Sequence, residues 1–250
     1  MSPAREKRPL VGIVDYGAGN LVSVARGLEI AGAEARLIRR PEDLGDVELL
    51  VVPGVGAAAP AMARLEAAGL VDPIRAWLEA DRWFLGICLG LQLLFDGSDE
   101  DGAETLGAIR GRTRILSGGA RLPHIGWNQV ERHRDHPTFE EIPDGADFYF
   151  VHSYAGRPEG PTAGELVLAE TTDGSSFVSA VARGRMLGVQ FHPERSGPYG
   201  LRFLGNVVDL VRRDAGVEAA GASPVKAGAP AVEVAASAVQ VAAPAVESVV

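Results

Sequence analysis

Short apolar runs alternate with stretches of helical spacing along the first hundred residues of the chain. The apolar runs predict buried strands at residues 10–15, 34–39, 48–52 and 83–87. The helical spacing predicts helices at residues 21–31, 57–67 and 71–80, with a further helix over residues 89–95. This alternation predicts an α/β fold: an open, mostly parallel, twisted sheet with helices on both faces.

The second half has a different pattern, in which strand-like runs are joined by short Gly, Pro and Asp turns. These runs lie at residues 148–154, 166–172, 176–183 and 186–192. Because short turns favour antiparallel neighbours, we expect these runs to add mixed or antiparallel strands to the sheet. A final helix is predicted over residues 201–213.

The two ends of the chain differ in composition from the region between them. Residues 1–9 form a polar extension, and residues 10–213 are expected to form one domain. The last 36 residues are mostly Ala, Val, Gly, Pro and Ser, with no aromatic residue and four charged ones. We expect residues 214–250 to be a low-complexity, disordered tail, because prolines interrupt it and no helical or alternating period is sustained there.

Charge and cysteine content limit the binding partners and the cellular compartment that we expect. The formal net charge is −9 and the sequence pI is about 5.1, which argues against nucleic acid or an anionic membrane as the main partner. A single cysteine cannot form an internal disulfide, so we expect a cytoplasmic protein with a reduced thiol. No apolar stretch approaches the roughly 18 residues of a membrane helix, and the first apolar run is too short for a signal peptide.

The only cysteine, Cys88, lies between Gly86 and Gly90, after a predicted strand and before a predicted helix. This order is typical of a nucleophile elbow, a tight turn that exposes the nucleophile at the carboxyl end of the sheet. The N-terminus of the following helix would favour the thiolate. The alternative is a small core residue, but the context of the turn favours a nucleophile.

A thiolate that attacks an acyl carbon needs a base. The segment QFHPE at residues 190–194 follows a predicted strand, and in an extended backbone His192 and Glu194 would face the same way. Glu194 would then accept a hydrogen bond from the imidazole and hold its tautomer, which predicts a triad of Cys88, His192 and Glu194. The alternative is an exposed turn with a chance histidine.

The same chemistry needs hydrogen-bond donors for the developing oxyanion. The segment of Gly54, Val55 and Gly56 follows the third predicted strand, and its glycines allow the backbone to turn N–H groups inward. With the N–H of Leu89, this segment would form the donor pair. The alternatives are an ordinary strand-to-helix turn and a phosphate-binding loop, for which Gly-x-Gly alone is weak evidence.

Three motifs together make the chain resemble the class I, triad-type glutamine amidotransferases: Gly-x-Cys-x-Gly-x-Gln, Pro-Gly-x-Gly after the third strand, and a late His-Pro-Glu. Four further stretches make it similar to the glutaminase subunits of imidazole glycerol phosphate synthase, from histidine biosynthesis. They are DYGAGNL at 15–21, LPHIGWN at 122–128, YFVHSY at 149–154 and HPERSG at 192–197. The resemblance covers about residues 10–213.

The resemblance implies a mechanism. Cys88 attacks the side-chain amide of glutamine, His192 passes the thiol proton to the leaving ammonia, Glu194 orients His192, and the γ-glutamyl thioester is hydrolysed to glutamate. It also implies that the loop with Val55 and Gly56 reorganises to complete an oxyanion hole with Leu89. The substrate-binding residues that it implies are Gly54, Gly56, Gln92, His152, Ser153 and Tyr154. For Gln92 the alternative is a solvated helix residue, which the motif spacing disfavours.

The resemblance further implies a heterodimer with a separate (β/α)₈ cyclase subunit. Ammonia would pass through the barrel to a phosphoribulosyl-formimino nucleotide, giving imidazole glycerol phosphate and aminoimidazole carboxamide ribonucleotide. The residues expected near this interface are Asn20, Trp127, Tyr149 and Arg195. Members of the family usually carry Lys after His-Pro-Glu, and Arg195 keeps the charge but not the geometry.

We expect no metal and no organic cofactor, because the histidine of PHIGW has no second ligand at a useful spacing. Trp127 has the alternative of a plain core aromatic. Three other functions stay open from the residues alone: a different amidotransferase or γ-glutamyl hydrolase, a non-catalytic regulatory module on the same fold, and a cysteine peptidase. The DYGAGNL and PHIGWN stretches disfavour the first, and an intact triad disfavours the second.

Overall fold

The computed structural model describes residues 8–117 and 121–216. Its strands are β1 (Leu10–Val14), β2 (Glu34–Ile38), β3 (Leu49–Gly54), β4 (Trp83–Cys88), β5 (Phe95–Ser98), β6 (Ile109–Ile115), β7 (His124–Arg132), β8 (Ala146–His152), β9 (Tyr154–Pro158), β10 (Val167–Asp173), β11 (Ser175–Arg183) and β12 (Met186–Val189). Its α-helices are α1 (Leu21–Ile30), α2 (Ala58–Ala67), α3 (Val71–Glu79), α4 (Leu89–Gln92), α5 (Ala163–Leu166) and α6 (Gly197–Asp214). Three 3₁₀ helices are η1 (Pro41–Leu44), η2 (Pro137–Phe139) and η3 (Pro193–Arg195). The low-complexity tail from residue 217 and residues 1–7 lie outside the described residues, so the expectations for them stay predictions.

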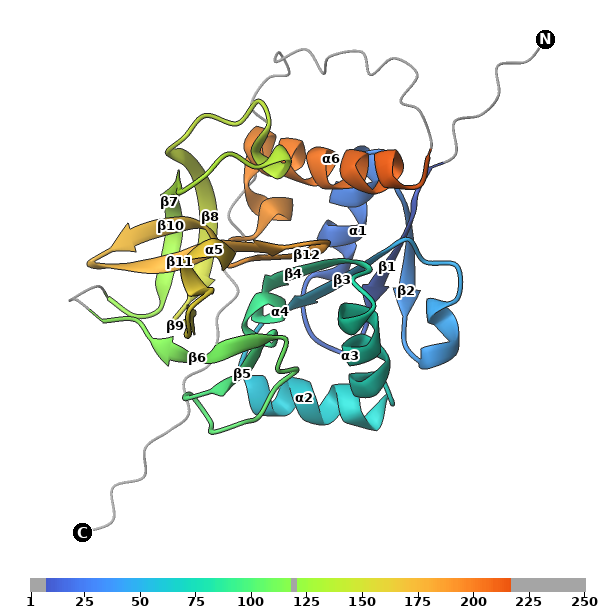
Figure 1. Cartoon of the computed structure of the whole chain (residues 1–250), viewed down its shortest axis with the longest axis horizontal. Coiled ribbons are helices and arrows are strands. Elements are labelled where there is room, and N and C mark those ends of the chain that lie inside the picture. The colour runs from blue at the N-terminus through green and yellow to red at the C-terminus, as the bar shows by residue number, and fades with distance from the viewer. Residues whose placement is uncertain (1–7, 118–120, 217–250) are drawn as a thin grey trace. The chain divides into compact units, whose positions relative to one another are not determined.

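The central sheet has the strand order β2-β1-β3-β4-β12-β11-β10-β7-β8 (Figure 1). Its first five strands run parallel to one another, and the pairs β12–β11, β11–β10, β10–β7 and β7–β8 are antiparallel. Helices α1 and α6 cover one face and α2 and α3 the other (Figure 1). The predicted fold, a mostly parallel sheet with antiparallel strands added by the second half, is confirmed.

The central strands bury both faces, which explains their continuous apolar runs. In β3, Leu49 and Val51 pack into the core on the α1 and α6 side, whereas Leu50 and Val52 pack on the α2 and α3 side. All four side chains are fully buried. Burying such a side chain contributes about 1.5–3 kcal/mol, so these strands form a firm support for the residues at their carboxyl ends.

The helix predicted over residues 89–95 is wrong in extent. Helix α4 ends at Gln92, and β5 begins at Phe95. The backbone carbonyls of Leu94 and Phe95 accept hydrogen bonds from Ile109 and Gly107. This apolar run therefore turns away to pair within a second, three-stranded sheet of order β5-β6-β9, and that tertiary pairing outweighs its helical spacing.

The strand predicted over residues 148–154 is two strands in different sheets. β8 belongs to the central sheet and β9 pairs with β6, with the break at Ser153, whose carbonyl accepts from the N–H of Leu116. Strands β6 and β7 were not predicted, because arginines alternate along β6 and much of β7 is exposed. Helix α6 begins at Gly197, four residues before the predicted start. In the described part of the chain, no helix is both long and apolar enough to cross a membrane.

Candidate active site

Cys88 is the last residue of β4, and α4 begins at Leu89. The Cys88 backbone has φ +54° and ψ −107°, a strained conformation for a residue with a side chain. The flanking glycines leave room for it: a Cβ on Gly86 would lie 2.5 Å from the carbonyl oxygen of Gly90, and a Cβ on Gly90 would lie 1.7 Å from that of Val52. The chain therefore forms the tight turn that its Gly-x-Cys-x-Gly pattern predicts.

The surroundings of the Cys88 sulfur differ from the sequence-based expectation in one respect. Helix α4 is a single turn of four residues, so its dipole is small. Instead, the side-chain amide of the fully buried Gln190 donates from Nε2 to Sγ at 3.5 Å. The Oε1 atom of Gln190 accepts from Nε2 of Gln92 at 3.1 Å, which orients the amide. Gln190 opens the QFHPE motif, but its role as a donor to the sulfur was not predicted.

Gln190→Leu is expected to slow the reaction of Cys88 with iodoacetamide at pH 7 by about tenfold. The substitution removes the amide that donates to the sulfur, and a hydrogen bond to a charged group such as the reacting thiolate contributes about 1.5–3 kcal/mol. Since Cys88 is the only cysteine, the label reports on this sulfur alone. Asn206→Leu is the control, because it removes another buried amide, one that donates to the carbonyl oxygens of Thr138 and Glu140 instead of to the sulfur. Equal alkylation rates for wild type and Gln190→Leu would contradict the assigned contact.

His192 and Glu194 form a buried pair. Nδ1 of His192 lies 2.9 Å from Oε1 of Glu194, and the two side chains are 6% and 2% exposed. Burial alone would lower the pKa of His192, but Cys88 and Glu194 together raise it to about 10. Nε2 is buried and has no partner at hydrogen-bonding geometry among the described residues. Because Cys88 contributes to the raised pKa of His192, the sulfur lies within interaction range of the imidazole ring.

The route by which His192 and Glu194 meet differs from the predicted one. The backbone is extended at His192, but η3 begins at Pro193, so the two residues do not lie on one straight strand. Phe191 holds the segment in place: it is fully buried, and its ring centroid lies 4.2 Å from that of Phe148. The side-chain contact was predicted from a spacing of two, but a 3₁₀ turn rather than a strand produces it.

The expected oxyanion segment begins beside the nucleophile. In the parallel pairing of β3 with β4, Gly54 lies opposite Cys88. Val55 is 47% exposed, and Gly56 has φ +91°, a left-handed conformation that suits glycine. A Cβ built on Gly56 meets no atom within 4 Å. The segment thus lies next to the sulfur with its middle open, and its role as an oxyanion hole with Leu89 stays a prediction.

The residues expected to bind substrate lie near the same sulfur. Gln92 is buried, and its Nε2 donates to the carbonyl oxygen of Tyr154 at 2.7 Å, so it is not a solvated helix residue. The carbonyl oxygen of Val151 lies 3.9 Å from Sγ of Cys88. The backbone that follows, with His152 and Ser153, therefore passes beside Cys88, as a contact with the substrate's α-amino and carboxylate groups requires.

His152 and His124 form a second buried pair. Nδ1 of His152 donates to the carbonyl oxygen of Tyr154 at 2.9 Å, so its Nε2 accepts from Nδ1 of His124, 3.2 Å away. Burial lowers the pKa of His152 to about 4, and the nearby His124 and His192 add to this lowering. The native state therefore keeps this pair neutral where the unfolded chain would bind a proton.

This pair predicts a loss of stability in acid. Above pH 6.5 His152 is neutral in both states, and between pH 6.5 and about 4 only the unfolded state takes up the proton. His152 should therefore remove up to about 3 kcal/mol from the free energy of unfolding over that range. Urea denaturation at pH 7 and pH 4 measures how far the free energy of unfolding falls in acid. This fall should be smaller for His152→Gln than for wild type, and for the more exposed His133→Gln it should equal that of wild type. A wild-type loss for His152→Gln would contradict the prediction.

Three of the residues expected at the partner interface form one stack. The rings of Trp127 and Tyr149 meet edge to face with centroids 6.0 Å apart, and the guanidinium of Arg195 lies 4.0 Å from the centroid of Tyr149. Trp127 is 56% exposed, which excludes the alternative of a core aromatic. Asn20 caps α1 by accepting from the N–H of Ser23 at 3.2 Å.

A small cavity of about 50 Å³ lies beside the His192–Glu194 pair and is also lined by Asn20 and Arg195. Its lining includes Asn20, Gly54, Val55, His192, Glu194 and Arg195. A larger hollow of about 470 Å³ lies elsewhere, and its lining includes none of the residues predicted for catalysis. Within residues 8–117 and 121–216, no three His, Cys, Asp or Glu side chains gather as metal ligands would.

Comparisons with known proteins identify the family of the chain. A family model described as glutamine amidotransferase class-I matches residues 12–209. Imidazole glycerol phosphate synthase subunit HisH of Dehalococcoides mccartyi (strain ATCC BAA-2266 / KCTC 15142 / 195) is 42% identical over 207 residues, which cover 82% of this chain and 99% of the relative. The protein of the same name from Synechococcus sp. (strain JA-2-3B'a(2-13)) is 45% identical over 214 residues, covering 84% and 97%.

Solved structures show the same fold at lower identity. A chain of the structure of PurLQS from Thermotoga maritima has a TM-score of 0.64 at 19% identity, covering 82% of this chain and 100% of that chain. The crystal structure of a glutamine amidotransferase has a TM-score of 0.62 at 22% identity. Taken with the family model and the relatives of 42% and 45% identity, these matches leave one assignment: the chain belongs to the class I glutamine amidotransferases and, among them, to the HisH subunits of imidazole glycerol phosphate synthase in histidine biosynthesis.

Proposed function

We propose that this chain hydrolyses glutamine through Cys88, His192 and Glu194 and delivers the ammonia to a separate (β/α)₈ cyclase subunit. The cyclase would use it to make imidazole glycerol phosphate and aminoimidazole carboxamide ribonucleotide. The observation that carries the proposal is the buried His192–Glu194 pair, which interacts with a thiol held on a strained turn at the end of β4. Membership of the HisH family supports the same assignment.

The first half of the reaction forms a thioester. With its pKa raised to about 10, His192 is protonated at neutral pH and favours the Cys88 thiolate. The sulfur attacks the side-chain carbonyl carbon of glutamine, and the carbonyl oxygen takes up negative charge. When the carbon–nitrogen bond breaks, His192 gives its proton to the leaving nitrogen, and ammonia departs from the γ-glutamyl thioester.

The second half of the reaction regenerates the Cys88 thiolate. His192, now neutral, takes a proton from water as the water oxygen attacks the thioester carbonyl. The carbon–sulfur bond then breaks and releases glutamate and the Cys88 thiolate, while the proton stays on Nε2 of His192, which restores the starting state. Throughout, Glu194 accepts from Nδ1 of His192, which leaves Nε2 as the nitrogen that moves protons.

The oxyanion would be bound by backbone N–H groups at the end of β3 and the start of α4. Leu89 supplies the N–H that directly follows the nucleophile, and Val55 or Gly56 would supply the second. The open surroundings of Gly56 support a change of backbone conformation there when substrate or partner binds. One such donor contributes about 10²–10³ in kcat in other acyl-transfer enzymes.

The partner surface would be centred on the stack of Trp127, Tyr149 and Arg195. An exposed tryptophan and an arginine over a tyrosine ring are side chains typical of interface hot spots. The small cavity next to His192 reaches Asn20 and Arg195, so ammonia released at His192 would leave toward this surface.

Glutamate release from glutamine tests the proposal, measured for the chain alone and for its complex with the cognate cyclase and the nucleotide substrate. We expect little release by the chain alone and a large rise in the complex. Absence of glutamate release from a complex whose assembly has been verified would overturn the catalytic assignment.

A further inference from the structure

The segment from Val55 to Ala57 links β3 to α2 and is bordered by two polar contacts that come from distant parts of the chain. On one side is the hydroxyl of Tyr16, just after β1, and on the other is the carboxylate of Asp101, between β5 and β6. Neither residue was assigned a role in the sequence analysis. If the segment supplies an oxyanion donor, these contacts decide which of its peptides are free to turn.

Tyr16 holds the start of the segment. Its hydroxyl donates to the carbonyl oxygen of Pro53 at 2.9 Å, and the residue is only 5% exposed. Next along the chain, a Cβ on Gly54 would lie 2.2 Å from that hydroxyl and 3.0 Å from Cβ of Leu89. Burial raises the pKa of Tyr16, as does the charge of Cys88, so the hydroxyl keeps its proton and remains a donor. The peptide between Pro53 and Gly54 is therefore closely packed and tethered.

Asp101 holds the end of the segment. Helix α2 has Ala57 at its N-cap, which offers no side-chain cap, and the carboxylate of Asp101 accepts from the N–H of Ala59 at 2.6 Å instead. A carboxylate at this position also interacts favourably with the helix dipole. Because the contact joins residues 42 positions apart, it ties the first turn of α2 to the loop between β5 and β6.

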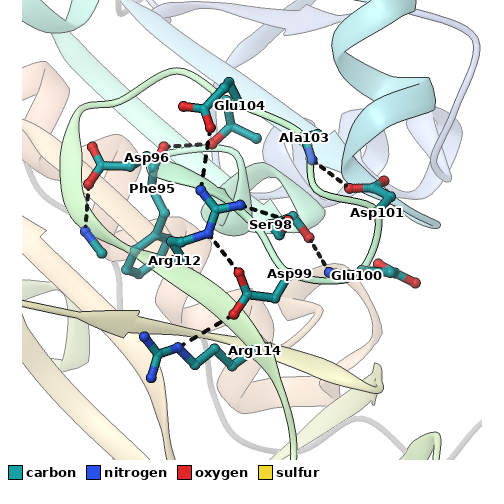
Figure 2. A network of polar contacts seen from close by, with 12 residues as sticks. Phe95, Asp96, Ser98, Asp99, Glu100, Asp101, Ala103, Glu104, Arg112 and Arg114 are labelled. Atoms are coloured by element: carbon teal, nitrogen blue, oxygen red, sulfur yellow. Dashed lines mark hydrogen bonds and ion pairs between the residues drawn. The ribbon is translucent and has the colours of Figure 1, made fainter.

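That loop is itself braced by Arg112, as Figure 2 shows. The guanidinium donates to Asp99 at 2.6 Å, to the carbonyl oxygen of Ser98 at 3.0 Å and to Glu104 at 3.5 Å. Asp101 also accepts from the N–H of Ala103 at 3.2 Å. The loop therefore presents its carboxylate to α2 from a fixed position.

Between the two contacts, the chain is less closely packed. Val55 is 47% exposed and Gly56 has open space around it. We infer that Tyr16 and Asp101 are positioning residues of the glutaminase site, which hold Pro53 and Ala59 so that only the peptides between Val55 and Ala57 turn to supply the oxyanion donor. This inference rests on the proposed function.

The test uses Tyr16→Phe and Asp101→Ala, each in complex with the cognate cyclase and its nucleotide substrate. We expect each substitution to lower the kcat of glutamate release by about tenfold while KM for glutamine stays within twofold, because the donor would be misplaced in the transition state. Asp101→Asn should recover most of the rate, since its amide oxygen still accepts from the N–H of Ala59.

Two matched variants distinguish an effect on the position of the oxyanion donor from an effect on the stability of the fold. Asn206→Leu removes another buried side-chain group that donates to backbone carbonyls, those of Thr138 and Glu140, and Asp72→Ala removes an exposed carboxylate from the first turn of α3. Both control variants should keep kcat within twofold of wild type, even where their melting temperature falls as far as that of Tyr16→Phe or Asp101→Ala. The inference would be overturned if Tyr16→Phe and Asp101→Ala kept the wild-type kcat. It would also be overturned if the control variants lost as much kcat, or if Asp101→Asn did not restore it. An inactive wild-type complex would instead refute the proposed function.

Discussion

Cys88→Ala is expected to reduce glutaminase kcat by about 10⁴-fold or more in the complex with the cyclase. The reaction would lose its covalent route, and a neutral methyl group would replace the thiolate that interacts with His192. Cys88 is 4% exposed and alanine removes only the sulfur, so the fold should persist. Glutamate release under saturating glutamine, with a melting curve for each variant, measures the effect.

Ammonium salt is the control for this substitution. Ammonia added to the solution replaces the product of the glutaminase, so the complex with Cys88→Ala should still form imidazole glycerol phosphate at a wild-type rate. Substantial glutamate release by the variant would show that Cys88 is not the nucleophile. Loss of the ammonium-dependent reaction would show that the substitution disturbs the partner rather than the chemistry.

Gly90→Ala is expected to lower the free energy of unfolding by about 3 kcal/mol or more, at the upper end of overpacking effects. The added Cβ would lie 1.7 Å from the carbonyl oxygen of Val52, in the central strand β3, where neither backbone has room to move. For a domain of this size, that loss corresponds to a fall of about 6–12 °C in melting temperature. The same displacement would move the Cys88 turn, so glutaminase activity should fall with stability.

Gly205→Ala is the matched comparison. Gly205 lies within α6, and its added Cβ would meet no atom within 4 Å. Alanine is favoured over glycine in a helix interior by about 1 kcal/mol, so this variant should be as stable as wild type or more stable, with full activity. If Gly90→Ala were as stable as Gly205→Ala, the close packing of the elbow against β3 would be wrong.

The parallel half of the sheet and the order of the catalytic motifs could be predicted from the amino-acid sequence. Strands such as β3 are buried on both faces, so their apolar runs are continuous and easily recognised. Glycines at 86 and 90 around Cys88 indicated a turn that only small residues permit, and the spacing of His192 and Glu194 indicated their contact. These features are local, because they depend on residues within a few positions of one another.

Features that depend on residues far apart in the chain could not be predicted and are seen only in the folded protein. The run after Gln92 has helical spacing, yet it leaves the helix because Phe95 and its neighbours pair with residues near 107 and 109. The donor to the Cys88 sulfur is Gln190, 102 residues away, rather than a long helix behind the thiol. Likewise, Tyr16 and Asp101 reach the two ends of the segment between β3 and α2 only once β1, β3 and the β5–β6 loop are packed together. A hydrogen bond between distant side chains leaves no period in the sequence, so only the folded chain shows which of its polar residues meet.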